Sequence, residues 1–553
     1  MENYPNPLIR FWSLLKANNK EIRQIYSLSF FSGLVALTLP LGIQAIINLI
    51  QGGEISISFV VLIIIVIAGI ILAGTLQVMQ LRITENIQQA LFARAAFDFA
   101  LRIPNIRSEE LYKKYAPELM NRFFDITTVQ KGLSKILIDF SLATLQIIFG
   151  LFLLSLYHPI FILLSITVFL VLYLILKYTS KKGFETSVKE SGNKFNVAFW
   201  LQELAHARVS FKMTGSTHLA GSETDRRVNK YLTARENHYS ILKQQMVYLI
   251  GFKVFIAACL LSIGGILVIN QQMNIGQFVA AELIILLVIG SVEKIILCLE
   301  TIYDVLTSLE KIGQVTDLEL ENNTEGLSID NSTPFSIELK DVSFGYPNAV
   351  SATIENCSLQ IASNSKVAIH GNNGSGKSTL MKLISGQFQI QKGAICFNDL
   401  PVGNYQLNNI RMNTGTCING DELFNGTIED NITLGREQIT TNDIIEVIDL
   451  LMLKEFIKSL PQGLNTKVYN DGQSFPKSVI QKLLLARAIV HHPKLLLLED
   501  CFENLSETEK NKITDYLLLD KFNCTIIAIT NDEYYLSKCN HRYLMKSGTI
   551  SHA

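Results

Sequence analysis

The chain has 553 residues, of which 48% are hydrophobic and 18% charged, and its mean hydropathy is +0.28. Soluble domains usually carry about 25% charged residues, so part of this chain is suited to lipid. The apolar content excludes a disordered chain, and a net charge of −1 implies no nucleic-acid partner. The eight cysteines form no CxxC pair and no zinc spacing, which fits reduced thiols.

The first 320 or so residues contain long apolar stretches. A membrane-spanning helix needs about 20 apolar residues, and Pro40 predicts a kink in the first of these stretches. We predict six spans, at Ile25–Ile50, Ile57–Leu81, Ile136–Leu156, Ile160–Tyr178, Val247–Ile269 and Gly276–Leu299.

The connections between the spans differ in charge. The long stretches Arg82–Lys135 and Lys177–Gln245 are rich in Lys and Arg, whereas the short connections carry neither. The positive-inside rule then predicts that both termini and both long stretches are cytoplasmic. Both stretches consist mostly of helix formers, so we expect helical extensions of the spans, ended by short crossing helices, with a break at Ile103–Asn105. Peripheral loops are the alternative, although loops of this length are rare.

Several charged residues fall inside the predicted spans. Glu282, Glu293 and Lys294 lie in the sixth span and Lys253 in the fifth. Intramembrane charge usually faces a cavity or a partner, so one hypothesis is a polar translocation path lined by the sixth helix. Glu293 could pair locally with Lys294 or with another helix, and for Lys253 we favour a side chain that extends to the membrane surface.

The strongest motif is the nine-residue segment Gly371-Asn-Asn-Gly-Ser-Gly-Lys-Ser-Thr379. It follows an apolar strand, Lys366–His370, and precedes a helical pattern from Leu380 to Ser385. This strand–loop–helix order is the context of a P-loop, in which backbone N–H groups surround phosphates. We therefore predict that Lys377 contacts the outer phosphates of a nucleotide and that Ser378 is a magnesium ligand.

Several further motifs align with one family. They are Pro117–Asp125, Glu310–Val315, Val342–Pro347, Pro461–Thr466, Leu485–Ala488 and the apolar strand Lys494–Leu498, which leads to Glu499 and Asp500. Together with the spans and the P-loop, they resemble an ATP-binding cassette (ABC) transporter of the exporter type, over nearly the whole chain. The stretch Leu39–Gln44 and the general layout are similar to the branch that secretes peptides and proteins.

The resemblance implies a multidomain fold. An all-α transmembrane domain with six helices and long cytoplasmic extensions would be followed by an α/β P-loop domain. The implied segments are an amino-terminal cytoplasmic segment (1–24), the transmembrane domain (25–318), a linker (319–334) and the ATP-binding domain (335–553). Such a half-transporter works as a homodimer or as a heterodimer with another half-transporter.

The resemblance also assigns ligands, ATP and Mg²⁺. Mg²⁺ would lie between Ser378 and Glu499. The nucleotide would contact the ring of Tyr346 through adenine and the P-loop through its phosphates, so that the nucleotide-binding residues are Tyr346, Gly371, Asn372, Asn373, Gly374, Ser375, Gly376, Lys377, Ser378 and Thr379.

The signature segment departs from the family pattern. The family's LSGGQ sequence falls on Phe475, Pro476, Lys477, Ser478 and Val479. Both glycines are missing, although close backbone approach to a phosphate favours glycine. Pro476 also lacks an N–H donor. We expect a degenerate signature in which Lys477 and Ser478 still offer donors.

The residues expected to assist hydrolysis differ too. The family has Asp and then Glu after the strand, whereas this chain has Glu499 and then Asp500; a one-residue slip would turn over the faces of the strand. As the residue next to the attacking water, Asp500 would reach roughly an ångström less far, and such a misplacement can cost about 100-fold in rate. Asn419 replaces an expected glutamine and Asn531 an expected histidine, and the segment Glu503–Ser506 lacks the family's Asp.

Two functions remain open. The first is an exporter subunit of a membrane, expected to be the bacterial cytoplasmic membrane, that couples ATP binding and slow hydrolysis to transport of a peptide, protein, lipid or small molecule. The second is a catalytically impaired ATP-binding subunit that regulates or supports a transport complex. Membrane lipid and a periplasmic adaptor are further expected partners.

Overall fold

The computed structural model describes residues 7–552 except 53–56, 113, 115, 216, 322–325, 331, 348, 350, 470, 471, 473, 520 and 521. The chain forms two compact units. Unit 1 comprises Met1–Pro104 and Lys114–Leu318, and unit 2 comprises Asn105–Lys113 and Glu319–Ala553. Residues 322–325 and 331 of the predicted linker lie outside the described residues.

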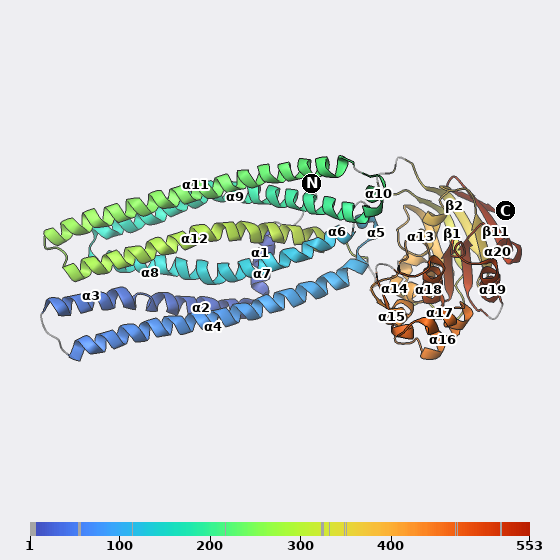
Figure 1. Cartoon of the computed structure of the whole chain (residues 1–553), viewed down its shortest axis with the longest axis horizontal. Helices are drawn as coiled ribbons and strands as arrows, with labels where there is room; N and C mark the ends of the chain where they lie inside the picture. Colours follow the sequence, from blue (N-terminus) through green and yellow to red (C-terminus); the bar gives the residue numbers. More distant parts are fainter. Residues whose placement is uncertain are drawn as a thin grey trace. The chain divides into compact units, whose positions relative to one another are not determined.

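Unit 1 is helical, and its long helices lie side by side (Figure 1). Helices α9 and α11, α8 and α12, and α2 and α4 pack against each other. The helices of unit 1 are α1 (Pro7–Ala17), α2 (Asn19–Val35), α3 (Thr38–Gln51), α4 (Ile57–Arg102), α6 (Ala116–Met120), α7 (Asp125–Lys135), α8 (Ser141–Tyr157), α9 (Ile160–His206), α10 (Arg208–Met213), α11 (Leu219–Ile269) and α12 (Ile275–Thr316).

The long basic stretches of the sequence are helical continuations of the apolar ones. Helices α4, α9 and α11 each run without a break through both apolar and charged sequence, over 46, 47 and 51 residues. Helix α4 ends at Arg102, where a 3₁₀ turn, Ile103–Asn105, contains Pro104. The expected helical extensions and the break at this proline are confirmed, and peripheral loops are the wrong alternative.

The first apolar stretch is split as Pro40 predicts. Helix α2 ends at Val35 and α3 begins at Thr38, so Pro40 lies in the first turn of α3. Proline is tolerated there because the N–H groups of a first turn have no partner within the helix. The kink therefore needs no broken hydrogen bond inside either helix.

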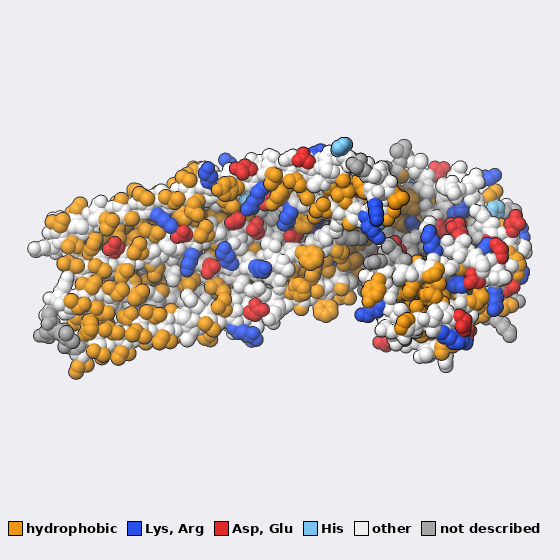
Figure 2. Space-filling view, in the orientation of Figure 1, with side chains coloured by type: hydrophobic (Ala, Val, Ile, Leu, Met, Phe, Trp, Pro, Cys, Tyr) orange, Lys and Arg blue, Asp and Glu red, His pale blue; other side chains and the backbone are white. Residues whose placement is uncertain are grey.

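Five helical stretches of the described residues are long and apolar enough to cross a membrane: Asn19–Gln51, Ile57–Asn105, Glu118–Tyr157, Ile160–His206 and Leu219–Ile269. In Figure 2, hydrophobic side chains gather over the part of unit 1 where α3 ends and α4 begins, and charged side chains lie farther along the helices. The sixth predicted span, Gly276–Leu299, lies inside the continuous helix α12, which is not among the five. That crossing stays a prediction.

One ion pair joins two helices of unit 1 inside the predicted spans. The Lys253 Nζ atom on α11 donates to the Glu293 Oε2 atom on α12 at 2.7 Å. Lys253 therefore has a partner on another helix, and its expected position at the membrane surface stays a prediction. Glu293 pairs with another helix, because each charge in an apolar environment is stabilised by an opposite charge nearby.

This pair predicts non-additive stability. Lys253→Met and Glu293→Gln each leave an unpaired charge between the helices, so each should lower the stability of unit 1 by about 1–2 kcal/mol. The double variant should lose less than the sum, as measured by thermal unfolding in lipid nanodiscs. The matched control is Lys243→Met, an exposed lysine on the same helix, which should have little effect. Additive losses in the double variant would contradict a direct pair.

Unit 2 is built on two main sheets, and β7 and β8 form a further antiparallel pair. A four-stranded antiparallel sheet has the order β2-β1-β4-β5, and a six-stranded sheet has the order β12-β11-β3-β10-β9-β6. Strands β11, β3, β10, β9 and β6 are parallel to one another, and β12 pairs antiparallel with β11. The strands are β1 (Ile337–Phe344), β2 (Ile354–Ile361), β3 (Lys366–His370), β4 (Lys392–Phe397), β5 (Leu400–Pro401), β6 (Thr414–Cys417), β7 (Gly426–Thr427), β8 (Lys467–Val468), β9 (Leu495–Glu499), β10 (Thr525–Ile529), β11 (His541–Lys546) and β12 (Thr549–His552).

Helices cover the faces of the parallel sheet. The strand β9 is buried at every position, as expected of a parallel strand covered on both faces. The carboxyl ends of β3, β9, β10 and β6 lie at the same edge, which is where α/β folds bind ligands. The helices of unit 2 are α5 (Ser108–Leu111), α13 (Lys377–Ile384), α14 (Leu407–Met412), α15 (Ile428–Thr433), α16 (Thr441–Leu450), α17 (Lys454–Ser459), α18 (Lys477–Ile489), α19 (Glu507–Leu518) and α20 (Glu533–Lys538).

Candidate nucleotide site

The loop between β3 and α13 is shaped by three glycines. Gly371, Gly374 and Gly376 have φ values of 151°, 79° and 104°, a region that favours glycine. A Cβ atom at Gly371 would lie 2.3 Å from the Met545 carbonyl oxygen, whereas one at Gly374 would meet nothing within 4 Å. The loop is therefore packed against the sheet at its base and open at its tip, where Asn372 and Asn373 are also exposed.

Lys377 begins α13 and folds back over this loop. Its Nζ atom donates to the carbonyl oxygens of Gly371 at 2.7 Å and Asn372 at 2.9 Å. The ammonium group and the amino-terminal end of α13 thus lie together at the open side of the loop. Both favour an anion, since the first N–H groups of a helix have no partner within it.

Ser378 and Glu499 meet beneath the loop. The Ser378 hydroxyl donates to Oε1 of Glu499, the last residue of β9. The other carboxylate oxygen, Oε2, accepts a hydrogen bond from the backbone N–H of Asn419 at 3.0 Å. The strand thus delivers Glu499, and not Asp500, to the serine of the loop.

Asp500 follows the strand in an unusual conformation. Its φ is 50°, and its backbone N–H donates to the Ile529 carbonyl at 3.1 Å. The side chain lines a hollow of about 700 Å³ together with Asn531, and a second hollow of about 330 Å³ together with Asn419 and Lys477. Asn531 and Asn419, which the sequence analysis expected to assist hydrolysis, therefore each line a hollow that Asp500 also lines.

The surroundings of Asp500 disfavour its charged form. Loss of hydration raises the pKa of this carboxyl above its ordinary value, and the negative charges of Glu503 and Glu499 raise it further. The positive charge of Lys377 acts in the opposite direction. A carboxyl group held this way can accept a proton more readily than a fully solvated one.

The signature segment ends in a helix. Phe475 lies in a bend with its ring 5.4 Å from that of Phe456, and Pro476 caps α18, which begins at Lys477. Ser478 belongs to the first turn of this helix and Val479 is buried. The segment consequently presents the amino-terminal end of a helix and one lysine, instead of a glycine loop.

Two residues near Asp500 escaped the sequence analysis. The Gln481 amide donates to the Asp500 carbonyl at 2.8 Å and accepts from the Asn504 side chain at 3.1 Å. Asp421 lies beside Asn419, and its carboxylate accepts the Ile418 N–H at 3.0 Å. The position of Gln481, one turn into the helix that follows the signature segment, could have identified it from the sequence. No feature of the sequence around Asp421 could have done so.

Tyr346 also lies next to the loop. Its hydroxyl is 3.1 Å from the Thr379 hydroxyl, directly after Ser378 in sequence. The ring is partly buried and packs edge-on against Phe344 and Phe388, at centroid distances of 5.2 and 5.4 Å. An aromatic ring therefore stands within reach of a ligand bound at the loop, although the role of each site residue remains a prediction.

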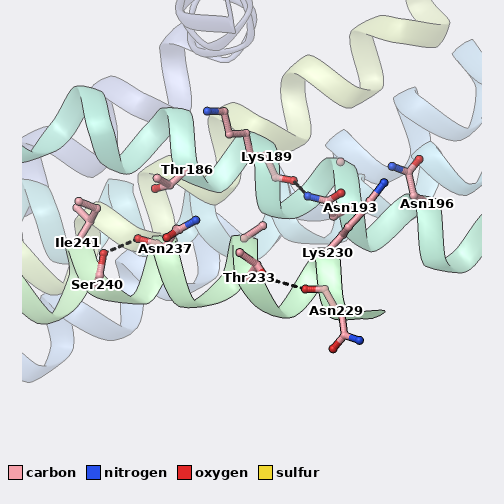
Figure 3. A pocket seen from close by; sticks show the side chains of 12 residues that line it. Thr186, Lys189, Asn193, Asn196, Asn229, Lys230, Thr233, Asn237, Ser240 and Ile241 are labelled. Carbon is pink, nitrogen blue, oxygen red and sulfur yellow. Dashed lines mark hydrogen bonds between the residues drawn. The ribbon is translucent and has the colours of Figure 1, made fainter. Parts of the chain in front are cut away.

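A separate groove of about 890 Å³ lies in unit 1 between α9 and α11 (Figure 3). Its polar side chains mostly bond to their own helices: Asn193 donates to the Lys189 carbonyl, Thr233 to that of Asn229 and Ser240 to that of Asn237. Because these polar groups bond within their own helices and do not point to a common position, we assign no ligand to this groove.

Comparisons with known proteins show which family the site resembles. Residues 354–503 match the model of the ABC transporter family, a range that includes the loop, Glu499 and Asp500. The chain is 30% identical over 241 residues to the uncharacterized ABC transporter ATP-binding protein YfiB of Bacillus subtilis, covering 44% of this chain and 42% of that protein.

Two secretion proteins of Escherichia coli are also similar. The alpha-hemolysin translocation ATP-binding protein HlyB of strain O157:H7 is 27% identical, over 65% of this chain and 51% of that protein. The colicin V secretion/processing ATP-binding protein CvaB is 21% identical, over 93% of this chain and 74% of that protein. The chain spans about half the length of the first two relatives.

The fold has a solved counterpart. A bacterial Atm1-family ABC exporter with ATP bound matches with a TM-score of 0.82 and 15% identity, over 97% of this chain and 94% of that one. At this identity the likeness concerns the fold. Residues 354–503 thus match the ABC transporter family, and the chain as a whole has the fold of an ABC exporter.

Proposed function

We propose that this chain is the ATP-binding subunit of a membrane exporter. The observation that carries the proposal is the contact of Ser378 with Glu499 under a glycine-bent loop that also holds Lys377. A cationic side chain, a helix amino terminus and two oxygen ligands converge on one open site. This set suits a nucleoside triphosphate with its divalent cation.

The residues present fit Mg²⁺. The Ser378 hydroxyl and the Glu499 carboxylate supply oxygen atoms, which this hard cation prefers, and they already touch each other. When bound with ATP, Mg²⁺ neutralises phosphate charge. Glutamate is longer than the family's aspartate, so Ser378 and Glu499 are expected to separate slightly to admit the ion.

For hydrolysis we propose Asp500 as the residue next to the attacking water, with Asn419 and Asn531 beside it. Asp500 shares a hollow with each of the two amides. Amides can orient a water molecule or a phosphate but cannot take up a proton. The arrangement supports slow turnover, because one short carboxylate is the only proton acceptor among the three.

The altered signature favours the second candidate, an impaired subunit that binds ATP without useful turnover. Pro476 supplies no N–H, and the donors that follow it belong to the first turn of α18. In a dimer this segment would face the ATP of the partner. A homodimer would place two such segments at its sites, whereas a heterodimer with another half-transporter would place one.

The fold of unit 1 and the apolar surface in Figure 2 support a place in a membrane, which we propose to be the bacterial cytoplasmic one. HlyB and CvaB are named for translocation of alpha-hemolysin and secretion of colicin V. We therefore favour a peptide or protein as the exported molecule over a lipid or small molecule, with an adaptor as a further partner.

Binding should depend on Lys377. Lys377→Ala removes the cation that faces the phosphates, so affinity for radiolabelled ATP should fall at least about tenfold. Equilibrium binding to purified protein measures this, with Lys382→Ala in the last turn of the same helix as the matched control. Equal affinity of the Lys377→Ala variant and the wild-type protein would contradict the proposed site.

Turnover should depend on Asp500. Wild-type protein should hydrolyse ATP slowly, Asp500→Asn should abolish hydrolysis, and Asp500→Glu should raise the rate about tenfold or more by restoring the carboxylate reach. Steady-state phosphate release measures all three. If the wild-type protein binds ATP without releasing phosphate, the impaired-subunit candidate stands and the exporter ATPase does not.

The decrease of the ATP hydrolysis rate at acid pH should reflect protonation of Asp500. As a proton acceptor Asp500 must be ionised, and its pKa is raised, so the rate should fall with decreasing pH earlier than for an ordinary carboxyl group. Glu503→Gln removes one negative charge and should move this decrease to lower pH. Glu507→Gln is the matched control in the same hollow; an unchanged pH dependence in Glu503→Gln would contradict the assignment.

A further inference from the structure

A short segment of the chain leaves unit 1 to join unit 2. Residues Asn105–Lys113 belong to unit 2, while the sequence before and after them belongs to unit 1. The segment begins with a β-bridge between Ile106 and Leu320 and contains the single-turn helix α5. Its backbone also accepts the Glu321 N–H at the Asn105 carbonyl, at 2.8 Å.

Polar contacts fix the orientation of this segment. The Arg107 guanidinium donates to Glu319 at 2.7 Å and to the side chain of Gln389 at 2.9 Å. The Glu109 carboxylate accepts the backbone N–H of Gln389 at 2.8 Å. Glu319 and Gln389 belong to two separate segments of unit 2, so contacts with both of them hold the residues that lead to Tyr112 in place.

At the end of α5, Tyr112 stacks on Tyr346. The ring centroids are 4.7 Å apart and the planes differ by 14°. Tyr112 also packs edge-on against Phe388, at 6.4 Å and 79°. With 48% of its surface exposed, Tyr112 contributes little to the core of unit 2. The stack also covers one face of the Tyr346 ring.

The covered ring is the one proposed above to receive adenine. A stacked base would need the same short separation from Tyr346 that Tyr112 now has, so the space between the two tyrosines is too narrow for it. The Tyr346 ring meets Phe344 and Phe388 edge-on, at 80° and 87°, so among these ring contacts the parallel stack is the one that Tyr112 makes.

We propose that Tyr112 is a built-in competitor for the nucleobase, which must displace Tyr112 from Tyr346 when ATP binds. This inference rests on the proposed function, because it assumes that Tyr346 stacks on adenine. The competition is reciprocal: whatever strengthens the tyrosine stack weakens base binding by the same factor. The chain before Asn105 and after Lys113 belongs to unit 1, so displacement of Tyr112 would move backbone that is covalently continuous with that unit.

Tyr112 would compete with the base of ATP and not with its phosphates. The rings that contact Tyr112 are those of Tyr346 and Phe388, which belong neither to Lys377 nor to the glycine loop proposed to bind the phosphates. A probe with phosphates but no base should therefore be insensitive to Tyr112. This distinction separates competition for the base from a general change in the fold.

The test compares ATP with inorganic tripolyphosphate on full-length protein. Direct binding of radiolabelled ATP is measured for wild type, Tyr112→Ala and Tyr112→Phe, and tripolyphosphate is measured as a competitor. Tyr112→Ala should bind ATP about three- to tenfold more tightly, with unchanged affinity for tripolyphosphate. Tyr112→Phe keeps the ring and should match the wild-type protein.

The control is Tyr469→Ala, which removes another exposed tyrosine of unit 2 and should change neither affinity. Unchanged ATP affinity in Tyr112→Ala would overturn the inference, and weaker ATP binding would make Tyr112 a stacking partner of the base instead. If no variant binds either probe, the proposed function itself fails, and this inference fails with it.

Discussion

The contact between Ser378 and Glu499 joins the phosphate loop to the strand β9, and the whole proposed site depends on these two parts of the chain. The residues are 121 positions apart, one at the start of α13 and the other at the end of β9. The loop can reach Glu499 only because Gly371 and Gly376 adopt backbone angles that other residues avoid. The buried strand β9 in turn fixes which carboxylate is presented.

This register has a chemical consequence. Because Glu499 ends the strand and contacts Ser378, Asp500 lies one step farther on, with a left-handed backbone and its carboxylate between two hollows. The loop has every residue that the proposed phosphate site needs, whereas the residues proposed for hydrolysis around Asp500 are those that the sequence analysis expects to depart from the family pattern. We therefore propose that binding and hydrolysis rest on separate groups of residues, and that the second group can change while the first remains.

The sequence predicted the local features of this site well. The strand β3, the loop and α13 follow from apolar and glycine patterns over about 20 residues, and the order of Glu499 and Asp500 follows from the buried strand. The break at Pro104 was equally local. Such features depend on the backbone preferences of neighbouring residues, which a single sequence displays.

Contacts between distant segments could not be predicted in this way. Lys253 gave no sign that it would meet Glu293, since both pairing and a surface position satisfy an intramembrane lysine. Tyr112 lies in a segment of ordinary helix formers, and only its joining of unit 2 brings it to Tyr346. The choice among such partners is made by packing of whole helices and strands, which leaves no pattern in the local sequence.

The most direct test of the site is the binding of Mn²⁺ in place of Mg²⁺, followed by electron paramagnetic resonance with ATP present. The wild-type protein should hold one Mn²⁺ per chain only when ATP is bound, with coupling to phosphorus, and Glu499→Ala should lose this ion while Asp500→Ala retains it. An ion that persists in Glu499→Ala and disappears in Asp500→Ala would contradict the register on which the account is built.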